Sequence, residues 1–220
     1  MSIALQFMQG YICICTGVQM FNQNSYVMKK STIITIAAVA VVGFWLVGAY
    51  NGMVTAEEGV DTAWSQVENV YQRRADLIPN LVSTVKGYAA HESETLEGVV
   101  NARAKATQVT VDAENLTPEQ LQKFNEAQGE LSSALGRLLA VTEAYPDLKA
   151  NENFLELQAQ LEGTENRIAT ERMKFNETAK EYNTLIRKFP KNIIASVFGF
   201  EKKPYFEAQE GADKAPAVQF

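Results

Sequence analysis

The feature that most constrains the fold of this chain is an uncharged run near the N-terminus, STIITIAAVAVVGFWLVGAY, at positions 31–50. A helix of about 20 residues spans ~30 Å, which is the thickness of the hydrocarbon core of a bilayer. Lys29 and Lys30 precede the run, and carboxylates follow it. Because basic flanks stay in the cytoplasm, the sequence predicts a single-pass inner-membrane anchor over residues 28–52, with the rest of the chain on the extracytoplasmic (periplasmic) side.

A cleaved signal peptide is the alternative to an anchor, because Val-Gly-Ala at 47–49 fits a small-residue cleavage site. The run is long for the apolar region of a signal peptide, and bulky residues at 44–46 lie just before that site. We therefore expect the run to remain attached as an anchor.

Residues 1–27 differ in character from the rest of the chain. Met28, followed by two lysines, is itself a suitable start for an exported protein. The first 27 residues are therefore either an upstream extension from a mis-assigned start or a short cytoplasmic tail. The chain's two cysteines, Cys13 and Cys15, both fall here, so the remainder holds no thiolate nucleophile, disulfide or cysteine-based metal site.

Charge and histidine content exclude several classes of function. The net charge of −6 gives no reason to expect a surface for phosphate groups, so nucleic acid is not an expected partner. His91 is the only histidine, which excludes a Ser-His-Asp triad or a multi-histidine zinc site made by this chain alone. We expect no metal and no cofactor, and we place His91 in an exposed linker.

Beyond the apolar run, the sequence pattern is helical. Apolar residues recur at steps of three and four, and the alternating runs that mark strands are missing from the sequence. A first helix ends near residue 88, a second begins near Ser93, a third begins at a capping box at 117–120, and a fourth occupies about 151–189. This pattern predicts an all-α fold, an antiparallel up-and-down four-helix bundle over residues 53–190 preceded by one N-terminal transmembrane helix.

Two charged residues interrupt apolar stripes that should face the interior of the bundle. Arg74 lies on the stripe of the first helix, and Glu171 lies on the stripe of the fourth. If Val60 is set against Phe189 in an antiparallel pairing, Arg74 and Glu171 differ in level by ~6 Å along the helix axis. An arginine side chain can span that offset. We therefore predict a buried Arg74–Glu171 ion pair that fixes the helix register. A polar binding site and a catalytic role are the alternatives.

Pro79 lies in the same segment, RRADLIPNLV, inside the first helix. Proline removes one backbone donor, so we expect a kink or one interrupted hydrogen bond there. We interpret the neighbouring Arg73 and Asp76 as part of a solvated helix face.

The segment NIIASVFGFEKKPYF follows the fourth helix as it returns towards the membrane. Its apolar residues, the candidate interface, are Ile193, Ile194, Val197, Phe198, Phe200, Tyr205 and Phe206. Lysines flank them on both sides. Such a segment, taken as residues 191–208, either lies in the bilayer interface or folds under the bundle and closes its base. The last residues, 209–220, are predicted to be disordered.

Several stretches resemble the LemA family, namely residues 50–92 with RRADLIPNLV at their centre, NARAKA at 101–106, NRIATERMKFNETAKEYN at 166–183, and FPKNIIASVFGFEKKPYFEA at 189–208. The resemblance implies a bacterial protein with an N-terminal membrane anchor and a helical bundle, without an established enzymatic activity. Some members resemble genomic neighbours of HtpX-type membrane metalloproteases, which implies a role as a partner or modulator.

We therefore expect a membrane-anchored helical interaction or scaffold protein. Its partner would belong to a membrane protein complex, with a membrane protease as one candidate, and association with a second copy of the chain stays open. The alternative is a module that binds a small ligand or lipid between helices near Arg74 and Glu171. An enzyme is disfavoured, because the sequence shows no nucleophile paired with a base.

Overall fold

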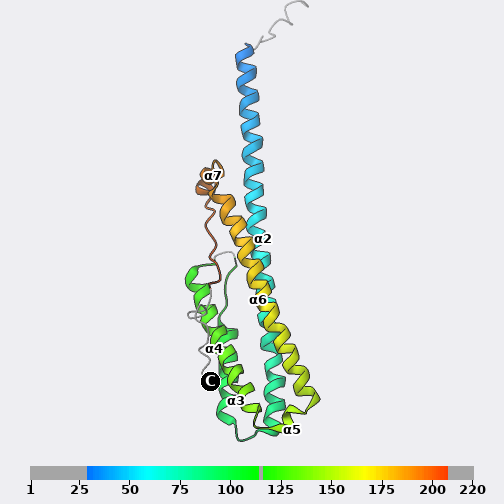
Figure 1. Cartoon of the computed structure of the whole chain (residues 1–220). Helices are drawn as coiled ribbons and strands as arrows, with labels where there is room; N and C mark the ends of the chain where they lie inside the picture. The colour runs from blue at the N-terminus through cyan, green and yellow to red at the C-terminus, as the bar shows by residue number, and fades with distance from the viewer. Residues whose placement is uncertain (1–28, 114–115, 208–220) are drawn as a thin grey trace, which may run out of the picture. The chain divides into compact units, whose positions relative to one another are not determined.

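A computed structural model describes residues 29–113 and 116–207 of the chain. Within these residues helices are the only regular secondary structure, so the all-α prediction is confirmed (Figure 1). The predictions for residues 1–27 and 209–220 lie outside the described part. The chain divides into two compact units, Met1–Val47 and Gly48–Phe220, and each is described by itself.

Helix α2 (Lys30–Tyr88) contributes residues to both units. In the first unit its large apolar side chains are exposed, as Ile34, Val41 and Phe44 illustrate. Among the described helices, α2 is the one that is long and apolar enough to cross a membrane. Because water does not stabilise a continuous apolar surface of this kind, the first part of α2 is a candidate membrane span.

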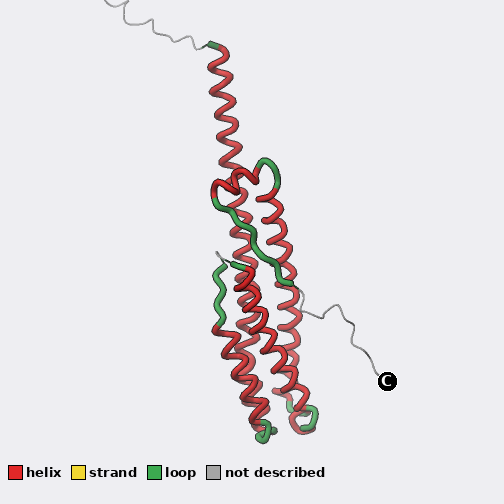
Figure 2. Tube along the Cα trace, turned by 90° about the vertical axis from the view of Figure 1, so that its left-hand side faces the viewer, coloured by secondary structure: helices red, strands yellow, loops and turns green. Residues whose placement is uncertain are grey.

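The second unit holds the rest of α2 and the other described helices. They are α3 (Ser93–Gln108), α4 (Pro118–Thr142), the short α5 (Pro146–Lys149), α6 (Glu152–Arg187) and α7 (Lys191–Phe198). Helices α2, α3, α4 and α6 lie alongside one another, as Figure 1 and Figure 2 show from two directions.

Capping side chains set the starts of α4 and α6. The backbone N–H of Gln120 donates to Thr117 Oγ1 at 3.2 Å, and the backbone N–H of Thr117 donates to Gln120 Oε1 at 3.1 Å, which confirms the predicted capping box. Asn151 Oδ1 accepts from the N–H of Phe154 at 3.0 Å. These bonds satisfy donors that the first turn of a helix leaves unpaired. Helix α6 ends at Arg187, earlier than expected, because a proline shortly afterwards disfavours helix in the residue before it.

The buried side chains of the second unit form two clusters that differ in chemistry. We call the first the aromatic half, because rings gather in it: Trp64, Tyr71, Phe124, Phe175, Tyr182 and Phe206. We call the second the aliphatic half; its members include Ile78, Leu81, Val85, Val99, Leu131, Leu138, Leu148, Phe154 and Leu161. Along α2, Arg74 falls between the last aromatic member, Tyr71, and the first aliphatic member, Ile78.

A non-helical segment completes the aromatic half. After α7, residues 199–207 run back along α6, and we call them the strap; Figure 2 draws them as a loop beside the helices. The side chain of Asn183 accepts from the N–H of Lys203 at 3.0 Å and donates to its carbonyl at 2.8 Å. Asn176 makes the same pair of bonds with Phe206, at 2.8 and 3.0 Å. Two asparagines thus satisfy backbone groups that an extended segment cannot satisfy by itself.

Pro79 leaves one carbonyl of α2 without its usual donor. The N–H that proline lacks would bond to the carbonyl four residues earlier, that of Ala75. Arg103 of α3 donates its Nε–H to this carbonyl at 2.7 Å, while α2 continues through the proline. The expected interrupted hydrogen bond is therefore present, and a side chain from α3 replaces the missing donor.

Candidate functional site

Arg74 is only 1% exposed and lies at the boundary between the two halves of the core. Its Nη1 donates to Glu165 Oε1 at 2.7 Å and to Ser132 Oγ at 2.9 Å. Its Nη2 donates to the side-chain oxygen of Gln128 and, at 3.4 Å, to the backbone oxygen of the same residue. The guanidinium carbon lies 5.1 Å from the centre of the Tyr71 ring. One side chain therefore joins α2, α4 and α6, and its Nε has no hydrogen-bond partner among the described residues.

The predicted Arg74–Glu171 pair is not formed. Glu171 pairs instead with Lys174 on the same helix, at 2.7 Å. The carboxylate that meets Arg74 belongs to Glu165, six residues before Glu171, or ~9 Å along the helix axis. The prediction treated Phe189 as the buried end of the fourth helix, but Phe189 lies beyond that helix and is 82% exposed. Because the prediction took Phe189 as the end of the paired helix, it placed the partner of Arg74 too far along the fourth helix, at Glu171 instead of Glu165.

Ring contacts fix the register of α2 against α6 independently. Trp64 packs against Phe175 with ring centroids 5.6 Å apart. Ten residues further along α2, Arg74 meets Glu165, which lies ten residues earlier on α6. An aromatic contact and an ion pair therefore agree on one register.

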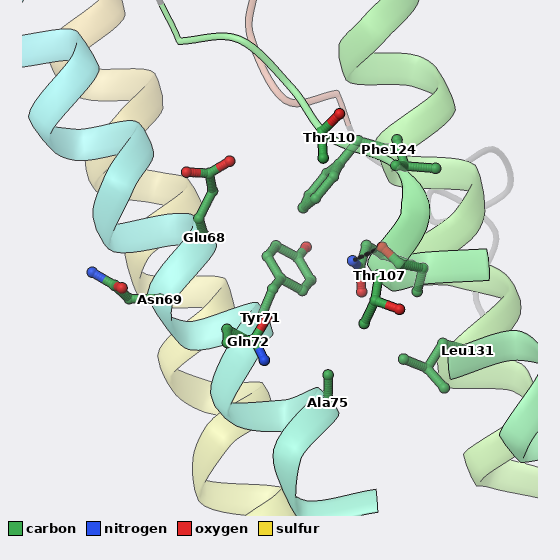
Figure 3. A pocket seen from close by; sticks show the side chains of 12 residues that line it. Glu68, Asn69, Tyr71, Gln72, Ala75, Thr107, Thr110, Phe124 and Leu131 are labelled. Atoms are coloured by element: carbon green, nitrogen blue, oxygen red, sulfur yellow. Dashed lines mark hydrogen bonds between the residues drawn. The ribbon is translucent and has the colours of Figure 1, made fainter. Parts of the chain in front are cut away.

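A cavity of about 290 Å³ opens beside the arginine, with lining residues from α2, α3 and α4 and from the segment after α3. Tyr71 and Gln128 both contact Arg74 and line the cavity. The other lining residues are Glu68, Asn69, Gln72, Ala75, Ala106, Thr107, Val109, Thr110, Phe124 and Leu131. Figure 3 shows the Tyr71 ring projecting from α2 towards Phe124 and Thr107. Among these residues Glu68 supplies the one formal charge, so the lining suits a small neutral molecule better than an anion.

A second buried cation fastens the strap. Lys203 is 6% exposed, and its Nζ lies 3.6 Å from Glu57 Oε1 and 3.6 Å from Asp61 Oδ1, both on α2. It also donates to the carbonyl of Ala113 at 3.2 Å. The hydroxyl of Tyr182 on α6 donates to the same Glu57 oxygen at 3.3 Å. The cluster thus joins α2, α6, the strap and the segment after α3.

Burial controls protonation in this second cluster. Removal from water raises the pKa of Asp61 above its ordinary 3.8, and the nearby Lys203 ammonium opposes that rise. Burial, together with the negative charge of Glu57, also raises the pKa of Tyr182. The Tyr182 hydroxyl therefore keeps its proton and remains a donor.

Comparison with protein families matches residues 63–220 to the LemA family. That range includes both buried cations and covers well over half of the chain. This chain belongs to the LemA family. The resemblance predicted from the sequence is therefore confirmed.

Relatives of this LemA-family chain include proteins named for the magnetosome and a protein named LemA. Over 204 aligned residues it is 31% identical to Magnetosome protein MamQ 2 of Paramagnetospirillum magneticum, with 82% of this chain and 74% of the relative covered. It is 30% identical to Magnetosome protein MamQ of Magnetospirillum gryphiswaldense, with 82% and 73% covered. It is 25% identical to Protein LemA of Metamycoplasma hominis, with 80% and 76% covered.

The predicted interface segment of this LemA-family chain occupies two environments. Ile194 and Phe206 are buried, and Phe200 is half-buried, so these side chains pack against the helices. The other predicted residues are exposed: Ile193, Val197, Phe198 and Tyr205. One group of the predicted residues therefore packs inward, as the second alternative expected, and the other group is exposed. Contact of the exposed group with the bilayer interface stays a prediction.

The remaining polar residues singled out in the sequence lie on the surface. Arg73 and Asp76 are exposed, and Asp76 accepts from Gln72 Nε2 at 2.7 Å. His91 is exposed in the turn between α2 and α3. Across residues 29–113 and 116–207, no group of three or more His, Cys, Asp or Glu side chains is arranged to hold a metal ion.

Sequence reasoning missed three residues that matter to the interior: Arg103, Glu165 and Lys203. A signal existed for Glu165, because the helical spacing places it four residues after Leu161 and three before Ile168, two apolar residues of the fourth helix. Arg103 and Lys203 each donate to a backbone carbonyl far away in the sequence. Periodicity carries no information about such contacts.

Proposed function

We propose that this LemA-family chain is a single-pass inner-membrane protein whose helical unit lies on the extracytoplasmic side. There it serves as an interaction or scaffold protein for a membrane protein complex. The observation that carries this proposal is the set of contacts that the two buried cations, Arg74 and Lys203, make inside the helical unit. Arg74 and Lys203 form hydrogen bonds and ion pairs that join the helices and the strap to one another. Such an interior favours a firm body that presents its outer faces to partners.

We further propose that α2, α3, α4 and α6 form an antiparallel up-and-down four-helix bundle over residues 53–190. The anchor would occupy 28–52, and the segment 191–208 would follow the bundle. The order of contacts supports this arrangement, because the residue number rises along α2 as it falls along α6. The short connections after α2 and α4 support it as well.

The proposed topology is testable by labelling with a membrane-impermeant maleimide. The full chain would carry serine in place of Cys13 and Cys15, and one new cysteine at the exposed Leu155. Intact spheroplasts should label this cysteine, whereas a cysteine at Lys29 should react only after permeabilisation. The reverse pattern would place the helical unit in the cytoplasm. A mature chain that begins near Tyr50 would replace the anchor with a cleaved signal peptide.

The proposed partner role is testable by photo-crosslinking in native membranes. A photoreactive residue would replace Val100 on α3, Leu155 or Met173 on α6, all of which are exposed. We expect one face to give a covalent adduct of constant mass with a membrane protein, and a membrane protease is one candidate. The MamQ relatives are named for the magnetosome; for this chain we propose work within a larger membrane assembly. If none of the three positions gave a covalent adduct, the result would count against the scaffold role.

A second candidate function is a binding module for a small ligand or lipid, and the cavity beside Arg74 favours it. Native lipid and metabolite extracts should then raise the unfolding temperature of the full chain in micelles. Thr107→Phe, which fills the cavity, should abolish the rise, whereas Ala104→Phe, at an exposed position on the same helix, should not. Equal rises in both variants would exclude the cavity as the binding site.

A further inference from the structure

We propose that the exposed face around α7 is a lipid-binding foot, which rests on the membrane that holds the anchor and prefers anionic headgroups. The apolar centre of the foot is Phe189, Ile193, Val197 and Phe198, and its basic rim is Arg187, Lys188, Lys191 and Lys202. The proposal rests on membrane anchoring and adds a second, separate contact with the lipid.

The apolar centre of the foot is exposed. Its four side chains are 56–82% exposed: Phe189 82%, Ile193 56%, Val197 74% and Phe198 61%. Ile193 and Val197 are four residues apart on one helix and therefore face the same way. Ile194 and Ala195 are buried in the aromatic half of the core, which fixes the orientation of α7.

The apolar residues of the foot all fall within residues 189–198. The other exposed large apolar residues described in the second unit are more dispersed: Tyr88, Val100, Leu155 and Met173 lie on α2, α3 and α6, Tyr205 lies on the strap, and Tyr50 packs against Phe198. Single exposed apolar residues are ordinary, whereas a contiguous patch indicates a contact surface.

The foot contacts the end of the apolar run directly. Tyr50, the last residue of the run at 31–50, lies with its ring centroid 5.0 Å from that of Phe198 and 5.7 Å from that of Phe200. Tyrosine at the end of a membrane span is typical of the headgroup level. Because Tyr50 and Phe198 belong to the same unit, an anchor that spans the bilayer brings the foot to that level.

The rim supplies the charge that anionic lipids attract. Lys188, Lys202 and Arg187 are exposed and Lys191 is half-buried, and Glu201, which precedes Lys202 in the sequence, is exposed as well. An interfacial helix combines such a basic rim with an apolar face that enters the headgroup region by about 5–10 Å. A basic rim around apolar side chains next to an interfacial tyrosine fits a lipid surface better than a protein groove.

Site-directed spin labelling of the full chain in bilayers tests the foot. Serine would replace Cys13 and Cys15, and one nitroxide would be attached at Val197→Cys, Leu155→Cys or Val41→Cys. The bilayers would contain phosphatidylcholine and phosphatidylglycerol. Collisions with oxygen relative to a water-soluble nickel chelate report depth. We expect the ratio at Val197 to be severalfold above that at Leu155 and below that at Val41, within the apolar run.

Equal ratios at Val197 and Leu155, with a high ratio at Val41, would overturn the foot while leaving the anchor intact. A low ratio at Val41 would instead refute membrane anchoring. A Val197 label that is open to water in lipid bilayers but shielded in native membrane vesicles would identify a protein contact and also overturn the lipid proposal.

The preference for anionic lipid has its own test. The triple variant Lys188→Glu, Lys191→Glu and Lys202→Glu should move the Val197 label towards water, by a severalfold fall in the ratio. A control with three exposed lysines changed to glutamate elsewhere, Lys86, Lys123 and Lys149, carries the same net charge and should leave the ratio unchanged. Equal shifts in the two variants would overturn the role of the rim.

Discussion

The two halves of the helical core are closed in different ways. In the aliphatic half, the buried residues of α3 pack against α4 and α2, and Arg103 of α3 bonds to the α2 backbone. In the aromatic half, the extended strap lays Phe206 against Trp64, with ring centroids 5.8 Å apart. A helix satisfies its own backbone, whereas an extended strap needs outside partners, which Asn176 and Asn183 supply. The aliphatic half is therefore closed by helices that pack together, whereas the aromatic half also depends on an extended segment, residues 199–207.

Arg74 stands at the junction, so its network should couple the two halves. A sharp test is to remove its carboxylate partner. Glu165→Leu leaves a 1%-exposed guanidinium without its counter-charge. Because the Glu165 side chain is itself 46% exposed and partly screened by water, the free energy of unfolding should fall by about 3 kcal/mol, the low end for a broken buried pair. Adding Arg74→Met should recover most of that loss, because no charge is then stranded. Urea unfolding of the full chain in micelles measures both.

Glu171→Leu is the matched control for that experiment. Glu171 pairs with Lys174, whose side chain is 57% exposed, so its removal should cost less than about 1 kcal/mol. A larger loss from Glu171→Leu than from Glu165→Leu would mean that the original register prediction was right.

The strap should be the part of the aromatic half that fails first. Phe206→Ala removes a ring packed against Trp64 and Phe175 and should cost about 3 kcal/mol. Because the strap lies at the end of the described chain, we expect local release. Hydrogen exchange should accelerate at the amides of Lys203 and Phe206, while amides of the aliphatic half keep their protection. Equal acceleration in both halves would show that they unfold as one body.

The aliphatic half has its own distinctive bond, from Arg103 to the carbonyl that Pro79 leaves free. Arg103→Leu leaves the Ala75 carbonyl unpaired and should cost about 1–3 kcal/mol. In a Pro79→Ala background the helix supplies its own donor, so the same substitution should cost clearly less. A double-mutant cycle on unfolding free energies measures the difference. Additive effects would show that the contribution of Arg103 to stability does not depend on Pro79.

The smallest effect concerns the pH dependence of the aromatic half. Asp61 has a pKa raised above 3.8 in the folded chain, so the folded state binds this proton more tightly than the unfolded state. The stabilising contribution of Asp61 to the free energy of unfolding is therefore complete at low pH and is lost as the pH rises from 3.8 through the raised pKa. Relative to Asp61→Asn, the wild-type chain should lose stability over that window. A constant difference between the two unfolding curves would contradict the raised pKa.

Local features of this fold were predictable because they depend on neighbours in the sequence. The capping box of Thr117 and Gln120 and the consequence of Pro79 for one backbone bond both follow from spacings of three or four residues. The candidate ion pair was predictable only in part. Arg74 is buried as expected, but its carboxylate partner is Glu165 rather than Glu171.

By itself the sequence determined the helical class of the described residues, the candidate membrane span, and the family. These depend on composition, periodicity and motif, which a chain carries without folding. Only the tertiary structure decided which carboxylate meets Arg74 and that Lys203 is buried. An ion pair requires approach within about 4 Å, whereas each residue of sliding moves two helices by about 1.5 Å. Register at that precision is set by packed rings such as Trp64 against Phe175, and these contacts exist only once the helices have met.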